Sequence, residues 1–318
     1  MYNEFVKNIT KESDNVRQKV LYNEKTLIGR LHKYFLTYFE TFSVPTADTL
    51  FLQLLSILAL ESAHSIRFLY EHFLFGITEK SLNVFYYACS YAKVDYSRFM
   101  NTTVRIALKL IPDSLQTQPV FLCVDDTMVS QFGTKFENVS KLFDHAAHNG
   151  SNYLNGHCFV SVMLCVPVWN GDKVSYLSVS LGYRMWQKKA PLNQTGSDRM
   201  KYIPLLLYSF RWNIEVSYYE QKTFWSFCNY MARSCKGIEM LVNLINISYC
   251  AMKILPYRNE HFSEYRTKSV QEFRFELSQG IRSQIFFATF VQNIETHIKS
   301  NAMAKALKQL ICQQVYHL

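Results

Sequence analysis

Two apolar runs and the turn sequence that follows the second constrain the fold of this chain more than any other feature. Residues 120–124 (VFLCV) form a short continuous apolar run, which is typical of a strand buried on both faces. Residues 157–168 form a second such run, and residues 174–181 alternate apolar and polar side chains. Between these two segments, residues 169–173 (WNGDK) favour a tight hairpin turn. The middle of the chain therefore predicts a buried strand followed by an antiparallel hairpin.

Helical periodicity dominates the sequence on both sides of this region. Residues 1 to about 112 predict a series of helices, with capping residues at Thr46 and Asp48, at Thr78, and at Asp95 and Ser97. Downstream we expect a helix from near Pro204 through Arg233, a second over 238–255, and helical structure from 265 to the end with a break at Gly280. The pattern predicts a mixed, helix-rich α/β fold in three regions: 1–115, 116–257 and 258–318.

Charge and cysteine content restrict the partner and the compartment. The formal net charge is +9, which favours a polyanionic partner such as nucleic acid and is also compatible with a merely basic protein. The eight cysteines form no Cys-x-x-Cys pair and mostly lie in apolar runs, so we expect free thiols in a reducing environment. The N-terminus has no apolar signal core, and the most apolar run, residues 50–60, is too short to span a bilayer. We expect a cytoplasmic protein, associated with the nucleoid if it binds DNA.

Two acidic residues follow the first apolar run. Asp125 and Asp126 are expected at the end of a buried strand, where carboxylates are costly unless they are solvated, paired or bound to metal. A turn that uses aspartate for backbone hydrogen bonds is the alternative. A zinc site built from Asp144, His145, His148 and the pair at 157–158 is a weaker hypothesis, because the spacing matches no standard structural pattern.

A helix face in the second half of the chain carries a set of polar side chains. Tyr208, Arg211, Glu215 and Lys222 fall within roughly 60° of one another on an α-helix. A solvated face with an Arg–Glu pair is the simplest interpretation of such a stripe. Together, an acid-bearing strand, an antiparallel hairpin and a later helix with a glutamate follow the order of parts in a ribonuclease H-like nuclease core. Such cores hold Mg²⁺ or Mn²⁺ between carboxylates to cut or join phosphodiesters.

These residues also resemble a family. Tyr208, Arg211, Glu215 and Lys222 match the Y-R-E-K signature of DDE insertion-sequence transposases, and residues 125–127 (DDT) resemble the first-aspartate motif of that group. The segments 156–184 and 211–225 are similar to the strand pair and the C-terminal part of the branch described as DDE superfamily endonucleases. The resemblance covers residues 45 to 257.

The resemblance implies a role for each matching position. Asp126 would be the first metal ligand, with Asp125 as its neighbour or substitute, and Glu215 would be the last. Arg211 and Lys222 would contact DNA phosphates near a transposon end, and Tyr208 would pack there. The helical N-terminal region would help to bind the terminal inverted repeats of double-stranded DNA. A homodimer, or a mixed oligomer with an intact transposase, is the partner arrangement that this implies.

The N-terminal helices offer a separate hypothesis for DNA binding. A helix, a turn at Gly76 and a second helix follow one another there in the order of a helix-turn-helix. Lys80, Ser81 and Asn83 would then head the second helix, where bases and phosphates are contacted. Plain packing of a helical bundle is the alternative.

The chain departs from the family pattern in one place. The second catalytic aspartate should follow a further helix and buried strand, but the polar segment between Tyr183 and Tyr208 contains only Asp198, in a turn-like sequence. An internal deletion near residues 187–200 explains the gap. The sequence therefore predicts a degenerate, inactive DDE transposase with an incomplete core, an unpaired sheet edge and low solubility. The alternative function is that of a non-catalytic DNA-binding protein or a regulator of an intact transposase.

Overall fold

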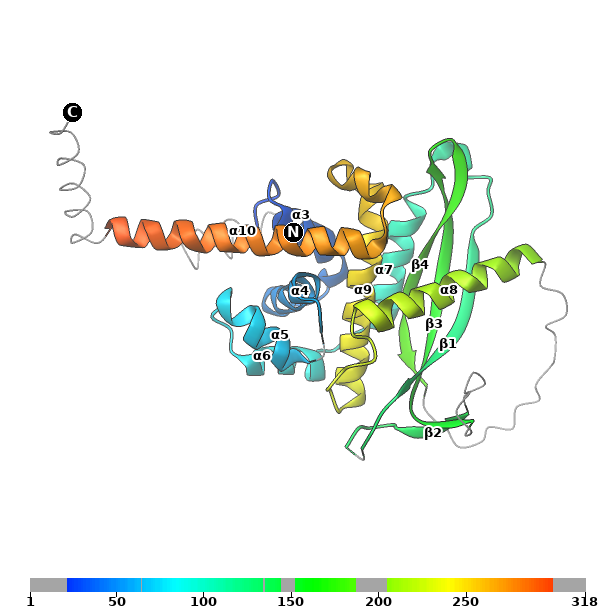
Figure 1. The fold of residues 1–318 in the computed structure, drawn as a ribbon, viewed down its shortest axis with the longest axis horizontal. Helices are drawn as coiled ribbons and strands as arrows, with labels where there is room; N and C mark the ends of the chain where they lie inside the picture. The colour runs from blue at the N-terminus through cyan, green and yellow to red at the C-terminus, as the bar shows by residue number, and fades with distance from the viewer. Residues whose placement is uncertain (1–21, 64, 134, 144–151, 187–204, 300–318) are drawn as a thin grey trace. The chain divides into compact units, whose positions relative to one another are not determined.

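A computed structural model describes residues 22–63, 65–133, 135–143, 152–186 and 205–299 of the chain (Figure 1). The fold is mixed helix and sheet, as predicted. By their internal contacts the residues form two compact units, one made of Met1–Val44 with Glu276–Leu318 and one made of Pro45–Phe275. The two units are described separately below.

The first unit contains helix α3 (Leu27–Phe39) and the part of helix α10 (Val270–Lys299) from Glu276 onward. Thr26 caps α3 by accepting a hydrogen bond from the backbone N–H of Gly29. The predicted break at Gly280 is wrong, because α10 continues through it. A β-carbon at Gly280 would lie 2.7 Å from the Leu27 side chain, so this glycine serves close packing and not helix termination.

The second unit begins with the helices that the sequence predicts. These are α4 (Val44–Ala59), α5 (Ile66–His72), α6 (Leu82–Tyr91) and α7 (Tyr96–Leu108), with short 3₁₀ helices at Leu74–Gly76 and Asp113–Leu115. Asp95 caps α7 as expected, accepting from the N–H of Ser97. Two capping predictions are wrong: α4 already contains Thr46 and Asp48, and Ser81, not Thr78, precedes α6.

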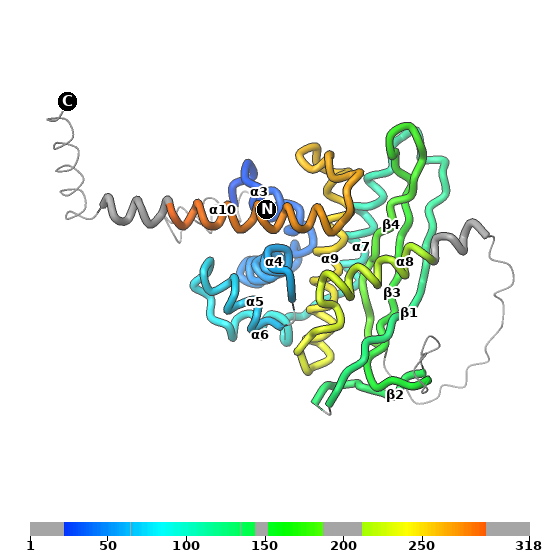
Figure 2. The backbone as a smooth tube through the Cα atoms, in the orientation of Figure 1, coloured from blue at the N-terminus to red at the C-terminus, as the bar shows by residue number. Residues whose placement is uncertain are grey.

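Four strands form one antiparallel sheet. They are β1 (Phe121–Ser130), β2 (Ser140–Phe143), β3 (Tyr153–Asn170) and β4 (Lys173–Met185). The long strand β3 pairs with β1 along one side and with β2 and β4 along the other, so β1 lies at the outer edge of the described sheet (Figure 2). The predicted hairpin is confirmed, with Gly171 at φ +59° in the turn. Strand β2 was not predicted, because residues 133–150 are expected to be loop.

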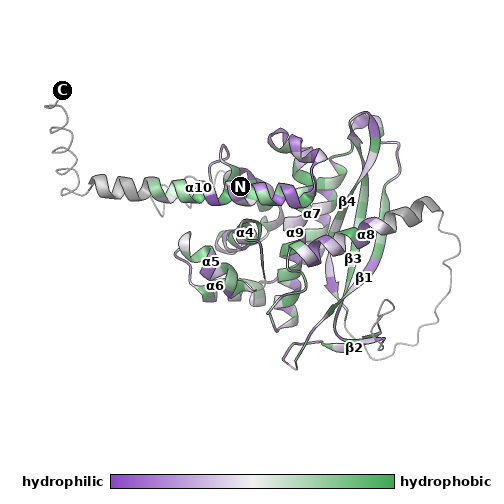
Figure 3. Cartoon of the chain, viewed as in Figure 1, coloured by the Kyte–Doolittle hydropathy of each residue, from purple (hydrophilic) through white to green (hydrophobic). Residues whose placement is uncertain are grey.

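The two faces of this sheet are covered by different helices. Helix α7 packs on one face, helix α8 (Leu205–Phe224) packs on the other, and helix α9 (Cys235–Arg258) lies along the outer edge of β4, whose backbone groups it binds. Strand β1 is not buried on both faces, contrary to the prediction: the side chains of Leu122 and Val124 are 66% and 68% exposed. Hydrophobic and hydrophilic residues both occur along β1 (Figure 3).

Helix boundaries after the sheet also differ from the sequence pattern. Helix α8 ends at Phe224 and does not continue through Arg233. Helix α9 includes Pro256 and ends at Arg258, and a 3₁₀ helix (Glu260–Thr267) leads into α10. Helix α9 is long and apolar enough to cross a membrane, but 89% of its apolar window is buried inside the fold, as in the core helix of a soluble protein. The cysteines that the structure describes are all free, as predicted.

Candidate functional site

Asp125 and Asp126 lie in the middle of β1 and not at its end. The strand continues to Ser130, so the predicted strand end at this point is wrong. Adjacent side chains on a strand point to opposite faces of the sheet. The two carboxylates of the DDT motif are therefore separated by the sheet, and only one of them can share a site with any given helix.

Asp125 belongs to the face that α8 covers. It lies directly opposite Ser161 of β3, and the hydroxyl of Ser161 forms a hydrogen bond to that of Ser180 (3.2 Å). On the same face, the ring of Tyr183 packs 6.1 Å from that of Tyr218 in α8, and Gln221 of α8 donates to the hydroxyl of Tyr183 (2.9 Å). The Oδ2 atom of Asp125 is buried beneath this helix face.

Tyr218 connects Asp125 to the glutamate of α8. Burial raises the pKa of the Tyr218 phenol, and the nearby Tyr183, Asp125, Glu215 and, least of these, Asp126 raise it further. Glu215 is exposed at the edge of the buried face of α8, one turn before Tyr218. The phenol oxygen of Tyr218 is buried and has no hydrogen-bond partner among the described residues. A buried hydroxyl beside two carboxylates is thus available for a water molecule or a ligand.

Asp126 belongs to the opposite face. Its Oδ2 atom accepts a hydrogen bond from the thiol of Cys158 (3.4 Å), and its cross-strand neighbour is Val160. Val160 lines a cavity of about 180 Å³ together with Tyr96 of α7. Because Asp126 faces α7 and Glu215 lies on α8, strand geometry pairs Glu215 with Asp125. Asp125, which the family resemblance gives only as a substitute for Asp126, is therefore the aspartate that is better placed to share a site with Glu215.

Of the two positively charged side chains in the Y-R-E-K stripe, the structure describes only that of Lys222. Helix α8 contains Tyr208 and Arg211 as predicted, but their side chains lie outside the described residues. Lys222 reaches across to β1, where its Nζ donates to the carbonyl oxygen of Met128 (3.1 Å). This bond ties the end of α8 to the strand that carries the aspartates.

The two proposed DNA-reading residues of the N-terminal region differ in environment. Lys80 is held at the start of α4, where its Nζ lies 2.9 Å from the carboxylate of Asp48 and donates to the hydroxyl of Thr49 (3.0 Å). Its charge is thereby partly neutralised within the protein. Asn83, in the first turn of α6, is exposed to solvent. Of the two, only Asn83 presents its side chain outward.

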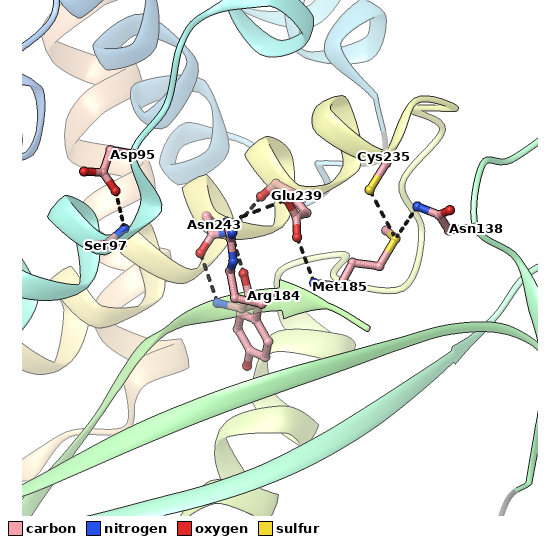
Figure 4. A network of polar contacts seen from close by, with 9 residues as sticks. Asp95, Ser97, Asn138, Arg184, Met185, Cys235, Glu239 and Asn243 are labelled. Carbon is pink, nitrogen blue, oxygen red and sulfur yellow. Dashed lines mark hydrogen bonds and ion pairs between the residues drawn. The ribbon is translucent and has the colours of Figure 1, made fainter. Parts of the chain in front are cut away.

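A polar clamp along the outer edge of β4, which sequence analysis did not identify, positions the aromatic core of the site (Figure 4). The amide of Asn243 in α9 accepts from the backbone N–H of Tyr183 (3.0 Å) and donates to its carbonyl oxygen (2.9 Å). Glu239, one turn earlier, accepts from the N–H of Met185 and lies 3.8 Å from the guanidinium of Arg184. A buried asparagine in an otherwise apolar helix was the available sequence signal, since such groups are nearly always hydrogen-bonded.

The zinc hypothesis receives no support from the part of it that is described. Asp144, His145 and His148 lie outside the described residues, and among those described no three His, Cys, Asp or Glu side chains group together as a metal site would require. His157 is engaged elsewhere: its Nε2 lies 2.8 Å from the carbonyl of Glu137 and its Nδ1 lies 2.6 Å from the hydroxyl of Tyr230. Since a carbonyl can only accept, Nε2 carries the proton and Nδ1 accepts from Tyr230.

The neutral state of His157 predicts a pH dependence of stability. Burial lowers the pKa of His157 below its ordinary value of 6.5, so the unfolded chain binds more protons than the folded one as the pH falls below 6.5. We expect this residue to reduce the unfolding free energy by at most ~1.4 kcal/mol for each pH unit over that window, and to have no effect well above it. Urea unfolding of the wild type and of His157→Gln at several pH values measures the slope.

The matched control for this experiment is the exposed histidine His72 of α5, changed to glutamine. His32, whose pKa burial lowers to about 3, contributes the same trend to every variant and cancels in the comparison. An unchanged slope in His157→Gln would show that this histidine is not held neutral.

The sequence implies a divalent metal, and the α8 face offers oxygen atoms that could bind one. Asp125 and Glu215 supply two hard oxygen ligands, and the hydroxyl of Tyr218 can bond to a coordinated water. This set fits one hydrated Mg²⁺ or Mn²⁺ ion, which proteins commonly hold through one or two carboxylates. A two-ion site of the kind expected for a ribonuclease H-like nuclease requires more ligands than these.

Comparison with known proteins adds no relative: no family model, no curated protein and no solved structure matches the chain.

Proposed function

We propose that this protein is a degenerate DDE-type transposase that binds double-stranded DNA without cutting it. One observation carries the proposal: Asp125 on the edge strand and Glu215 on a later helix both act electrostatically on the same buried side chain, Tyr218. The order of β1, β3 and β4 in the sheet, with α8 packed across it, supports an incomplete ribonuclease H-like core. The Y-R-E-K stripe that suggests the family lies on this same helix.

In this proposal the residues keep distinct roles. Asp125 and Glu215 would hold one divalent ion, which supplies electrostatic stabilisation to a phosphate oxygen when bound. Tyr218 orders water next to them, and Lys222 fixes α8 against β1 through the Met128 carbonyl. Arg211 would contact the DNA backbone, since a guanidinium matches phosphate geometry. Asp126 would have no part in the site, which departs from what the family resemblance implies.

The loss of cleavage follows from the missing second aspartate. The sequence offers only Asp198 between β4 and α8, in a turn-like context. Removal of a ligand from a metal-dependent active site typically costs orders of magnitude in rate. Two carboxylates are therefore proposed to retain at most one ion and to leave the protein unable to complete strand cleavage.

DNA binding and cleavage are tested in separate arms. Duplex oligonucleotides from the ends of the DNA that flanks the gene should bind the full chain with an affinity that falls steeply as salt rises. Arg211→Ala should weaken binding and flatten this salt dependence, whereas Lys173→Ala, an exposed turn lysine, should not. Fluorescence anisotropy measures both. Absence of binding at low salt would contradict the proposal.

The cleavage arm uses supercoiled plasmid and duplex substrates with Mg²⁺ and with Mn²⁺. No nicking is expected from the wild type at any metal concentration. Metal-dependent nicking that disappears in Asp125→Asn and Glu215→Gln but not in Asp126→Asn would show that the α8-face pair is an active site, and the protein would then be a working nuclease. Nicking lost only in Asp126→Asn would show that Asp126 is the catalytic aspartate, as the family resemblance implies.

A further inference from the structure

The outer edge of β1 is a surface to which the proposed function assigns no partner. Within the described ranges, β1 pairs only with β3, so its other side has no strand beside it. The side chains of Leu122 and Val124 are largely exposed at this edge, while Leu164 on the same face of β3 is buried. Exposed strand edges with apolar side chains are templates for pairing with another strand.

Backbone geometry shows which residues of β1 point outward. The N–H of Gln131 bonds to the carbonyl of Asn155 (2.9 Å), which continues the register of the β1–β3 ladder. In an antiparallel pair the bonded residues alternate, so the odd-numbered residues of β1 bond to β3 and the even-numbered ones direct their N–H and C=O groups to the outer edge. The backbone groups of Leu122 and Val124 therefore face outward.

Part of this outward row is already engaged. The N–H of Asp126 donates to the Oδ1 of Asp125 (2.9 Å), and the carbonyl of Met128 accepts from Lys222 (3.1 Å). No described residue bonds to the outward groups of Leu122 or Val124. The outer edge of β1 is therefore available for pairing at Leu122 and Val124. From Asp126 onward, part of its backbone is already hydrogen-bonded within the chain.

We propose that β1 pairs antiparallel with β1 of a second copy of this chain, about a twofold axis at Cys123. This register places Leu122 opposite the partner's Val124, and the reverse pair follows by symmetry. Both pairs join outward-facing backbone groups, so each can exchange two hydrogen bonds. The same two exposed apolar side chains thus form the contact on both copies, as a twofold interface requires.

Side-chain exposure selects this register over its neighbours. Only an axis at Cys123 sets Leu122 and Val124, the two most exposed apolar side chains of β1, opposite each other. An axis at Asp125 or Asp126 would set carboxylate against carboxylate. With the axis at Cys123, Asp125 and Asp126 lie opposite the partner's Phe121 and Val120, toward the ends of the ladder.

The size of the contact predicts weak association. A ladder of this length with two apolar side-chain pairs is well below the standard size of a stable interface. We expect a dimer whose population rises with protein concentration. Sedimentation velocity on the full chain should show this shift, and Leu122→Lys combined with Val124→Lys should weaken dimerisation at least tenfold. The control is Phe132→Lys, which alters a strongly exposed aromatic residue just beyond β1.

Cross-linking tests the register directly. Cys123 would face the partner's Cys123 across a non-bonded pair, with Cα atoms about 4.5 Å apart, within the range of a disulfide. The experiment uses the Cys165→Ala protein, because Cys165 interacts with the Cys123 thiol within one chain. Copper–phenanthroline oxidation should give a covalent dimer that is lost on adding Cys123→Ser and kept on adding Cys235→Ser.

Three results would overturn the proposal. The wild type could remain monomeric at every concentration, the double lysine variant could dimerise like the wild type, or the cross-link could survive in Cys123→Ser. Circular dichroism and thermal melting of each variant establish that it is folded. The pairing requires no DNA chemistry, so it stands or falls separately from the transposase proposal.

Discussion

Replacement of Arg274 by leucine is expected to lower the unfolding free energy by about 3–5 kcal/mol, because it leaves several buried carbonyl groups without their hydrogen-bond donor. Arg274 is 7% exposed and lies in the first turns of α10. Its guanidinium donates to the carbonyls of Ile57 (3.1 Å) and Leu60 (2.8 Å) at the end of α4, and to that of Phe224 at the end of α8. These are carbonyls that a helix end leaves without an intrahelical partner.

The cationic head also stacks on an aromatic ring. The guanidinium carbon of Arg274 lies 4.3 Å from the ring of Trp225, one of the largest fully buried side chains. Burial lowers the pKa of Arg274 to about 10, which still leaves the group charged at neutral pH. Leucine would leave three carbonyls unsatisfied and one face of the tryptophan without its cation.

Chemical denaturation of two further variants separates charge from geometry. Arg274→Lys keeps the charge but cannot donate to three carbonyls in a fixed plane, so most of the loss should remain. Arg282→Leu, an exposed arginine of α10, should change stability by less than about 0.5 kcal/mol. Equal stability of Arg274→Leu and Arg282→Leu would contradict the capping role.

The contacts of Arg274 also explain why sequence analysis placed the end of α8 too late in the chain. No glycine or proline interrupts the sequence between Pro204 and Gly237, so local signals predict a helix through Arg233. In the structure, Phe224 gives its carbonyl to Arg274 and Ser226 adopts φ +57°. Ser226 in turn accepts from the N–H of Ala63 (3.1 Å). The helix ends because of residues distant in sequence, which no local propensity can supply.

The sheet was predictable where its signals are local. The hairpin turn at Gly171 and the apolar strands beside it follow from turn chemistry and hydropathy alone. Strand β2 was missed because its four residues gain their pairing from residues 153–156 of β3. The exposure of Leu122 and Val124 was missed because an apolar run shows that a strand is present but not what lies beside it.

For the candidate site, sequence analysis identified the acidic residues but not their arrangement. Glu215 and the aspartate pair were identified, and a family pattern favours Asp126. Once β1 is known to continue through both aspartates, alternation alone assigns Asp125 to the α8 face. The error thus came from ending the strand at the aspartates, whereas β1 continues to Ser130. Tyr218 and Asn243 were not predicted, because their importance depends on burial against other elements.

Asn243→Asp is expected to have the second large effect, a loss of about 3 kcal/mol of unfolding free energy at neutral pH. The asparagine amide donates to the carbonyls of Tyr183 and Glu239 (2.9 and 2.8 Å). An ionised aspartate has the same shape but no donor, so its charge would face two carbonyl oxygens in a buried site. Gly182 permits the clamp, since a β-carbon there would lie 2.9 Å from the Asn243 side chain.

The pH dependence of this variant distinguishes lost donors from a packing defect. The buried environment should raise the pKa of the introduced carboxyl above its unfolded value, so the folded state binds an extra proton as the pH falls. The destabilisation should therefore be full at neutral pH and shrink on acidification, whereas a packing defect would not change. Asn170→Asp, in the exposed hairpin turn, is the control, and urea unfolding of both variants at several pH values is the measurement.

The same variant should also disturb the α8 face of the sheet. The clamp fixes the backbone of Tyr183, whose side chain crosses to the α8 face and accepts from Gln221 (2.9 Å) while packing on Tyr218. If the clamp loosens, the contact that sets Tyr218 beside Asp125 loosens with it. We expect faster hydrogen exchange in α8 of Asn243→Asp than in the wild type under conditions where both are folded. Exchange that increases only in α9 would show that the clamp supports its own helix and not the site.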